Sequence, residues 1–191
     1  MTQIFGDFID APSTSNEFLV IGFSPSSISL KQRWRNNGLS ANFMADYVTT
    51  FFPKSEEETE GLSRQSEIKS AVSFIANELL ENAMKFSDES SSYSIKIQLF
   101  LNHDNLVFFV ANSIAFDAVA GFQDYIQELL SSDPEEMYIR QVEKNIENDH
   151  QSGLGYLTMV NDYLAQLGWK FEEIPQDSST LIVTTMVKLK I

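Results

Sequence analysis

The sequence feature that most constrains the fold is a long amphipathic segment between residues 65 and 86. Its apolar residues recur at steps of three and four, which gathers them on one stripe of an α-helix. These residues are Ile68, Val72, Ile75, Leu79 and Ala83. The segment therefore predicts a long helix with one buried stripe.

Strand-like segments precede and follow this helix. Residues 18–24 form an apolar run that ends at Ser-Pro and predict a buried strand. Residues 92–101 and 105–112 predict two antiparallel strands, because the Asn and Asp residues between them suit a tight hairpin. Residues 169–174 and 180–190 predict a second hairpin at the end of the chain.

Four further helices are expected. Residues 39–52 repeat apolar residues at helical spacing until Pro53, and residues 122–132 form another such pattern. Residues 134–148 predict a helix capped by Asp133, and a last helix should run from Tyr156 to Leu167. The order β-α-α-β-β-α-α-α-β-β predicts an α/β two-layer sandwich, with a mixed, mostly antiparallel sheet and helices on one face.

The length of 191 residues predicts one domain over residues 1–191. Within it we expect an N-terminal strand and helix extension over residues 1–60 and a core over residues 61–191. The charged segment 53–63 is the best candidate for an exposed loop between the two parts.

Composition restricts the classes of partner. The 13 basic and 27 acidic residues give a net charge of −14, which opposes a nucleic-acid or anionic-membrane surface. The absence of cysteine excludes disulfides and thiolate metal sites, and no apolar run approaches the roughly 20 residues of a membrane span. We expect a cytoplasmic protein whose partners are proteins or small ligands. The basic residues Lys31, Arg33 and Arg35 predict a surface turn or a local contact site.

Residues 76–87, ANELLENAMKFS, contain the first candidate site. On a helix, Glu78, Asn82 and Lys85 project from neighbouring turns of one side. A carboxylate, an amide and an ammonium on one strip can bind magnesium and phosphate oxygens, and the carboxylate can act as a base. The alternative is an exposed polar face in which Glu81 pairs with Lys85.

Gly153, Leu154 and Gly155 form the second candidate, directly before a helix. Glycines at a helix start let the backbone approach a phosphate, and the free N–H groups and the helix dipole favour an anion. Taken alone, such glycines are as often part of a plain loop.

Together the two motifs resemble the GHKL superfamily of ATPases and kinases (histidine kinases, gyrase, Hsp90 and anti-sigma-factor kinases). Residues 76–86 look like its N-box, residues 152–160 like its G2 box, and residues 180–189 stand in the place of its terminal strand. The resemblance covers roughly residues 65–190 and implies a Bergerat-type ATP-binding fold.

The resemblance implies a role for each motif residue. Asn82 would coordinate the Mg²⁺ that bridges the phosphates of ATP or ADP, and Glu78 would serve as the base. Lys85 would reach the phosphates, Gly153, Leu154 and Gly155 would cradle them, and residues from about 117 to 152 would form the ATP lid.

The sequence departs from the family at the adenine site. There the family has an Asp-x-Gly-x-Gly box, whereas this chain reads VANSIAF at residues 110–116. Asn112 stands where the aspartate that binds the adenine amino group is expected, and both glycines are missing. An amide carbonyl can still accept that hydrogen bond, but the amide is uncharged and can flip. Nucleotide binding is therefore expected to be weakened, altered or lost.

Among GHKL proteins, a histidine kinase would need a phosphorylatable histidine on a dimerising helix. His103 is expected in a hairpin turn and His150 beside the glycine loop, so neither qualifies. The chain resembles stand-alone anti-sigma-factor kinases of bacterial partner-switching systems. Its N-terminal region looks more like SiaB-type kinases and related cyanobacterial regulators.

Two hypotheses follow. The first is an ATP-dependent serine/threonine kinase whose partner is an antagonist or effector, for example a STAS-like protein, with an acceptor Ser or Thr. The second is a non-catalytic binding module with a degenerate nucleotide site. A chance match in an unrelated α/β domain stays open, as does a homodimer through the N-terminal strand and helix.

Overall fold

The computed structural model describes residues 2–12, 17–24, 30–52, 64–88, 90–148, 153–174 and 177–191. Over these residues the chain forms a six-stranded sheet in the order β1-β5-β6-β4-β3-β2, and every neighbouring pair is antiparallel. The strands are β1 (Gln3–Gly6), β2 (Glu17–Phe23), β3 (Ile95–Leu101), β4 (Asn105–Ile114), β5 (Gln166–Ile174) and β6 (Asp177–Lys190).

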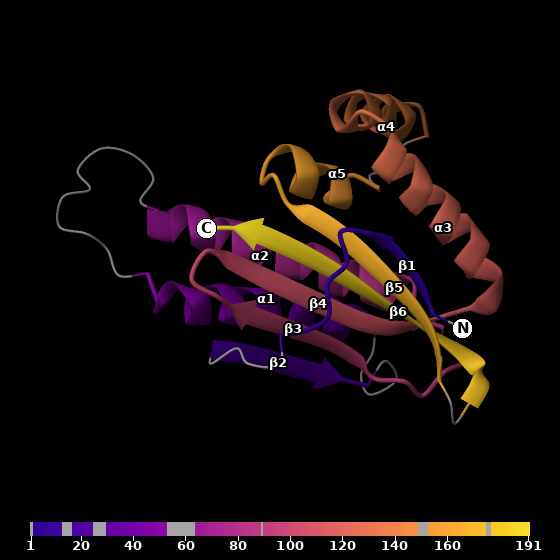
Figure 1. Cartoon of the computed structure of the whole chain (residues 1–191), viewed down its shortest axis with the longest axis horizontal. Helices are drawn as coiled ribbons and strands as arrows, with labels where there is room; N and C mark the ends of the chain where they lie inside the picture. Colours follow the sequence, from indigo (N-terminus) through magenta and orange to yellow (C-terminus); the bar gives the residue numbers. More distant parts are fainter. Residues whose placement is uncertain are drawn as a thin grey trace.

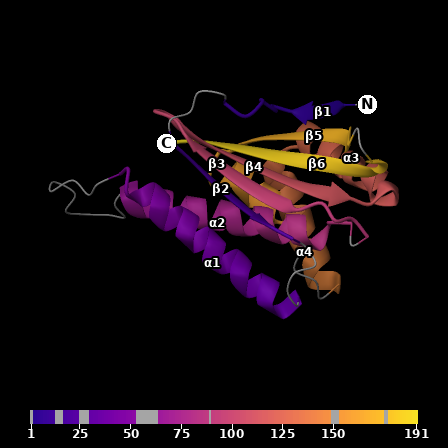
Figure 2. The ribbon, with the colours of Figure 1, turned by 90° about the horizontal axis from the view of Figure 1, so that it is seen from below.

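The helices lie against one face of this sheet (Figures 1 and 2). They are α1 (Leu30–Thr49), α2 (Arg64–Lys85), α3 (Phe116–Ser131), α4 (Pro134–Asn148) and α5 (Gly155–Asn161). The α/β two-layer sandwich predicted from the sequence is therefore confirmed. The sheet differs in one respect, because its described pairs are all antiparallel and not mixed.

Helix α2 is the central element of the helical layer. It agrees with the predicted helix to within one residue at each end, and the stripe that contains Ile68, Val72, Ile75 and Leu79 is buried. It packs against α1 on one side and against β3 and β4 above. The regular apolar spacing thus produces one long helix with a continuous buried stripe at the centre of the helical layer.

The opposite face of the sheet has a smaller apolar cluster. Phe100, Val107, Phe109 and Met186 are buried there, and Phe8 packs against them. Phe8 belongs to the segment after β1, which crosses this face of the sheet (Figure 1). Gly168 of β5 permits the crossing, because a Cβ at this position would meet the backbone of Phe8.

Several element predictions were wrong in extent. α1 begins at Leu30, which places Lys31, Arg33 and Arg35 in a helix and not in a surface turn. α3 begins at Phe116 and not at residue 122. α5 ends at Asn161 and not at Leu167, because Leu164 adopts a φ of +52° that interrupts the helix before β5.

The N-terminal residues form both edges of the sheet. β1, which was not predicted, pairs with β5, and β2 pairs with β3. β2 was predicted as a buried strand, but Phe18 and Val20 are 55% and 43% exposed. An edge strand over a half-covered face buries only alternate residues.

Other predictions were confirmed or fall outside the described residues. Asp133 caps α4, since its Oδ1 accepts the backbone N–H groups of Glu135 and Glu136 at 3.0 Å each. His103 lies in the β3–β4 hairpin, beside Asp104. The predicted loop at 53–63 and His150 lie outside the described residues. No helix in the described part of the chain is long and apolar enough to cross a bilayer.

The crossing of Phe8 over Gly168 predicts a stability effect. Gly168→Ala places a methyl group against the backbone of Phe8, and the free energy of unfolding should fall by about 1–3 kcal/mol. Gly38→Ala in α1 is the matched control: nothing lies within 4 Å of its Cβ, so it should gain roughly 0.5–1 kcal/mol from helix propensity. Urea denaturation measures both variants, and equal effects at the two sites would contradict the packing explanation.

Candidate functional site

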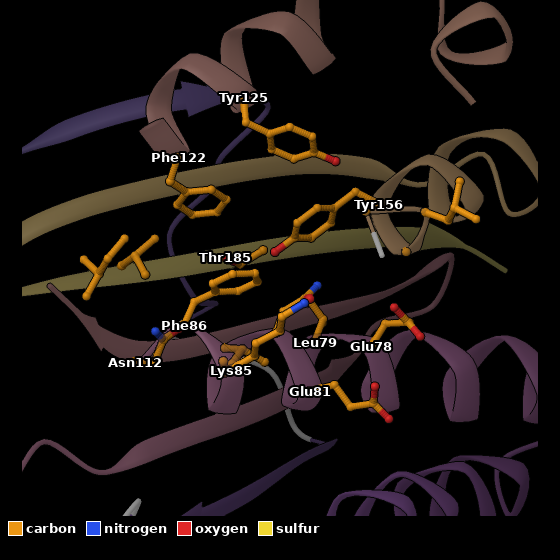
Figure 3. Close-up of a pocket in the computed structure, with 18 of the residues that line it drawn as sticks. Glu78, Leu79, Glu81, Lys85, Phe86, Asn112, Phe122, Tyr125, Tyr156 and Thr185 are labelled. Atoms are coloured by element: carbon orange, nitrogen blue, oxygen red, sulfur yellow. The ribbon is translucent and has the colours of Figure 1, made fainter. Parts of the chain in front are cut away.

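A pocket of about 700 Å³ opens among α2, β4, β6 and the helices α3 to α5. Its lining includes every residue that the sequence proposed for the site, namely Glu78, Asn82, Lys85, Asn112, Gly153, Leu154 and Gly155. These residues come from α2, from β4 and from the start of α5, so the fold brings together positions far apart in the sequence (Figure 3). The volume lies within the usual range for small-molecule sites.

The charged side chains of α2 that line this pocket are those of Glu78, Glu81 and Lys85. Asn77 Nδ2 donates to Glu81 Oε1 at 2.7 Å, and Lys85 makes no ion pair within the described part of the chain. Lys85 Nζ lies 5.2 Å from the centre of the Phe86 ring. The alternative Glu81–Lys85 pairing is therefore not formed, and the ammonium is available to an anion.

Glu78 has an unusual electrostatic environment. Partial burial raises the pKa of its carboxyl group, and the nearby carboxylate of Glu81 raises this pKa further. Its side chain packs closely against the start of α5, where a Cβ at Gly155 would meet Glu78 Oε2. A carboxylate with a raised pKa is a stronger proton acceptor, so Glu78 can act as a general base.

The two glycines have separate structural explanations. Gly153 adopts a φ of +82°, which favours glycine, and a Cβ there would lie 3.3 Å from the Gln141 amide of α4. Gly155 lets α5 approach the Glu78 carboxylate of α2. α5 has seven residues and no side-chain cap at Leu154. These glycines thus pack α4 and α2 against the pocket rim, whatever the pocket binds.

Asn112 lies in β4 at the closed end of the pocket and is 5% exposed. Its Nδ2 donates to the backbone oxygen of Ser113 at 2.8 Å. This bond favours one orientation of the amide, because a flipped amide would place Oδ1 against the Ser113 oxygen. Its Oδ1 has no hydrogen-bond donor among the described residues and is left as an acceptor for an exocyclic amine.

Tyr156 is a site residue that the sequence analysis missed. Its hydroxyl group lies close to Thr185 in the pocket (Figure 3), and the side chains of Thr185 and Asn82 act on its pKa. Burial raises the pKa of Tyr156, although these two side chains act in the opposite direction. A tyrosine directly after the second glycine is visible in the sequence, but its partners on α2 and β6 are not.

Aromatic side chains form much of the remaining wall. They are Phe74, Phe86, Phe122, Tyr125 and Tyr156. Tyr125 of α3 faces Tyr156 with its ring centre 6.5 Å away, and its buried hydroxyl oxygen makes no hydrogen bond to the described residues. Flat apolar walls with one unsatisfied hydroxyl suit an aromatic ring that carries polar groups.

The described residues contain no group of three or more His, Asp or Glu side chains that could hold a metal ion by themselves. Asn82 supplies one amide oxygen, and Glu78 lies one turn away on the same helix. Mg²⁺ in nucleotide sites is commonly held by one or two protein ligands together with water and phosphate oxygens. The residues therefore fit Mg²⁺ that arrives with a nucleotide.

Comparisons with known proteins add evidence on the fold. No family model and no curated protein matches the chain. The structure is similar to a chain in the crystal structure of the SiaB-SiaC complex from Pseudomonas aeruginosa, with a TM-score of 0.55 and 15% sequence identity. The match covers 90% of this chain and 89% of that chain. This supports the resemblance to SiaB-type proteins at the level of the fold, while membership of the GHKL superfamily stays a prediction.

The raised pKa of Glu78 predicts a pH effect on stability. A carboxyl with a higher pKa in the folded state binds more protons than in the unfolded chain, so its contribution to stability falls as pH rises above the ordinary value of 4.5. Glu78→Gln should therefore become more stable than the parent protein as pH rises from about 5 to 8. Urea denaturation across this range measures the effect.

Glu143→Gln is the matched control, because it removes an exposed carboxylate from α4. A stability difference for Glu78→Gln that does not change with pH would contradict the assignment. An equal pH dependence of stability for Glu143→Gln would also contradict the assignment.

Proposed function

We propose that this chain is an ATP-binding regulator of the serine/threonine protein kinase type that acts in a bacterial partner-switching system. The observation that carries the proposal is the convergence of Glu78, Asn82, Lys85, Asn112 and the Gly153–Gly155 segment on one pocket. The sequence analysis selected these residues by their chemistry, and the fold brings them together from separate elements. If the motifs matched by chance in an unrelated domain, there would be no reason for these residues to line one pocket.

The nucleotide would lie with its base among the aromatic walls and its phosphates toward α2. Asn112 Oδ1 would accept the adenine amino group, because Asn112 Nδ2 is committed to Ser113. Lys85 would attract the phosphates, and Asn82 would hold Mg²⁺ through its amide oxygen. When bound, Mg²⁺ neutralises charge on the phosphates during phosphoryl transfer.

Glu78 would accept the proton of the acceptor hydroxyl. The raised pKa of its carboxyl group suits this role, and the carboxylate lies beside Gly155 at the rim where the phosphates would end. The remaining contribution to catalysis is positioning, since phosphoryl transfer needs the hydroxyl oxygen in line with the γ-phosphate.

The partner is expected to be a small antagonist or effector protein with an acceptor Ser or Thr. The net charge of −14 favours a protein over a nucleic acid. The similar structure is a complex of two proteins by its title, which supports a protein partner for this chain as well.

Calorimetric titration with ADP and with a non-hydrolysable ATP analogue, both with Mg²⁺, tests the binding step. We expect binding, and Asn82→Ala should weaken it at least about tenfold, equivalent to about 1.4 kcal/mol. Circular dichroism should show an unchanged fold for the variant. The proposal fails if the parent protein binds neither nucleotide, or if Asn82→Ala binds both with unchanged affinity.

Hydrolysis of Mg²⁺·ATP, in which water takes the place of the partner's hydroxyl as phosphoryl acceptor, tests the catalytic step. Glu78→Gln should lower the rate by about 10²–10⁴-fold while nucleotide affinity stays within about threefold, because the carboxylate acts on the acceptor and not on the nucleotide. A variant that retains full turnover would remove Glu78 from the mechanism.

A second candidate function is a non-catalytic binding module, and Tyr156 favours it. Tyr156 lies beside Asn82, the side chain that Mg²⁺ would need, and both line the pocket. Tyr156→Phe removes the hydroxyl and distinguishes the candidates. If Tyr156 blocks the site, this variant gains nucleotide affinity over a parent protein that binds weakly; if Tyr156 belongs to a working site, affinity is unchanged or lower.

A further inference from the structure

Strand β2 forms an edge of the sheet. It lacks the features that usually keep an edge strand from pairing with a strand of another chain. Natural edge strands are commonly blocked by lysine, proline, a bulge or a very short length. β2 has seven residues, EFLVIGF, with regular pairing to β3 on one side. Phe18 and Val20 are 55% and 43% exposed. The other edge, β1, has only four residues.

Gly22 has no explanation within the single chain. Its φ is ordinary, and a Cβ at this position would meet only the backbone oxygen of Ile95 at 3.7 Å. Glycine weakens a strand, and it often marks a place where another group approaches closely. Phe18 lies four residues earlier on the same face, where its ring stacks on Phe100 at 6.0 Å.

Helix α1, on the other side of the sheet from Phe18 and Val20, also exposes apolar residues. Leu39 and Phe43 are 57% and 56% exposed, although they belong to a helix whose other face is buried against α2. The C-terminal part of α1 lies near β2, because the Tyr47 hydroxyl donates to Glu17 Oε2 at 3.4 Å. Four large apolar side chains on β2 and α1 are therefore exposed on neighbouring elements.

We propose that the β2 edge binds a second copy of the chain by antiparallel pairing of β2 with β2. A two-fold axis at Val20 places Val20 opposite Val20 of the second copy, and Phe18 opposite Gly22 of the second copy. Each Phe18 ring then covers a glycine, a pairing that stabilises sheet glycines. The same axis joins two six-stranded sheets into one, and α1 extends the contact below them.

The charges of β2 agree with self-pairing. Glu17 is the one charged residue of the strand and stands at its first position. In the two-fold register it faces Phe23 of the second copy, so no like charges lie opposite each other. Two chains of charge −14 nevertheless repel at long range, so the dimer should tighten as salt is raised.

Sedimentation of the full-length chain tests the proposal. We expect a dimer whose affinity rises with salt concentration. Val20→Lys places two ammonium groups opposite each other at the axis and should weaken the dimer roughly a hundredfold. Ile4→Lys is the matched control, because it adds the same charge to the exposed face of β1 and should leave the dimer intact. A monomeric parent protein, or a Val20→Lys variant that is still dimeric, overturns the proposal.

Disulfide cross-linking tests the register, because the chain contains no cysteine. Val20→Cys should oxidise to a covalent dimer, since opposite residues in antiparallel strands lie within disulfide range. Ile4→Cys should not. A mixture of Phe18→Cys and Gly22→Cys chains should cross-link more than either variant alone. Equal cross-linking by Val20→Cys and Ile4→Cys would show random collision and would overturn the proposed pairing.

Discussion

The packing of α2 against β3 and β4 is the interaction on which the rest of the structure depends. One side of this helix buries an apolar stripe, and the edge of the same helix presents Glu78, Asn82 and Lys85 to the pocket. The stripe fixes the rotation of the helix about its axis, because any other rotation would expose Val72 or Ile75. The position of the polar strip is therefore a consequence of core packing and needs no separate support.

The start of α5 packs against the polar strip of α2, and this contact has two consequences. Gly155 has no side chain because the Glu78 carboxylate occupies the space, and Tyr156 places its hydroxyl group between Thr185 and Asn82. The same close approach that brings a backbone segment near the α2 residues also inserts a buried phenol that needs hydrogen-bond partners. An intact α2 motif therefore does not by itself determine whether Asn82 is free to hold a metal ion.

Sequence reasoning predicted the features that local periodicity specifies. α2 is long and regular, and Asp133 followed by Pro134 marks the start of α4, so both were predicted correctly. β1 has only four residues and shows no alternation that distinguishes it from a loop. The end of α5 was missed because Leu164 continues the apolar pattern in sequence but adopts a left-handed conformation.

The site was predictable to the extent that its chemistry is carried by local motifs. Glu78, Asn82 and Lys85 lie on one helix, so their spacing alone places them together. The role of Tyr156 depends on partners from α2 and β6, and the favoured orientation of Asn112 depends on a backbone oxygen. The contacts of Tyr156 join residues from separate elements, so no pattern in a single sequence predicts them.

Charge places a last constraint on what the pocket can bind. Among the described lining residues, Glu78 and Glu81 oppose the single ammonium of Lys85, inside a chain of net charge −14. A bare polyphosphate would therefore meet a repulsive field both at a distance and at the site. A bound cation reverses this balance, because it reduces the charge of the ligand and can use the amide oxygen of Asn82. If the pocket binds a nucleotide, as proposed, we therefore expect it to bind the magnesium complex more tightly than the free nucleotide.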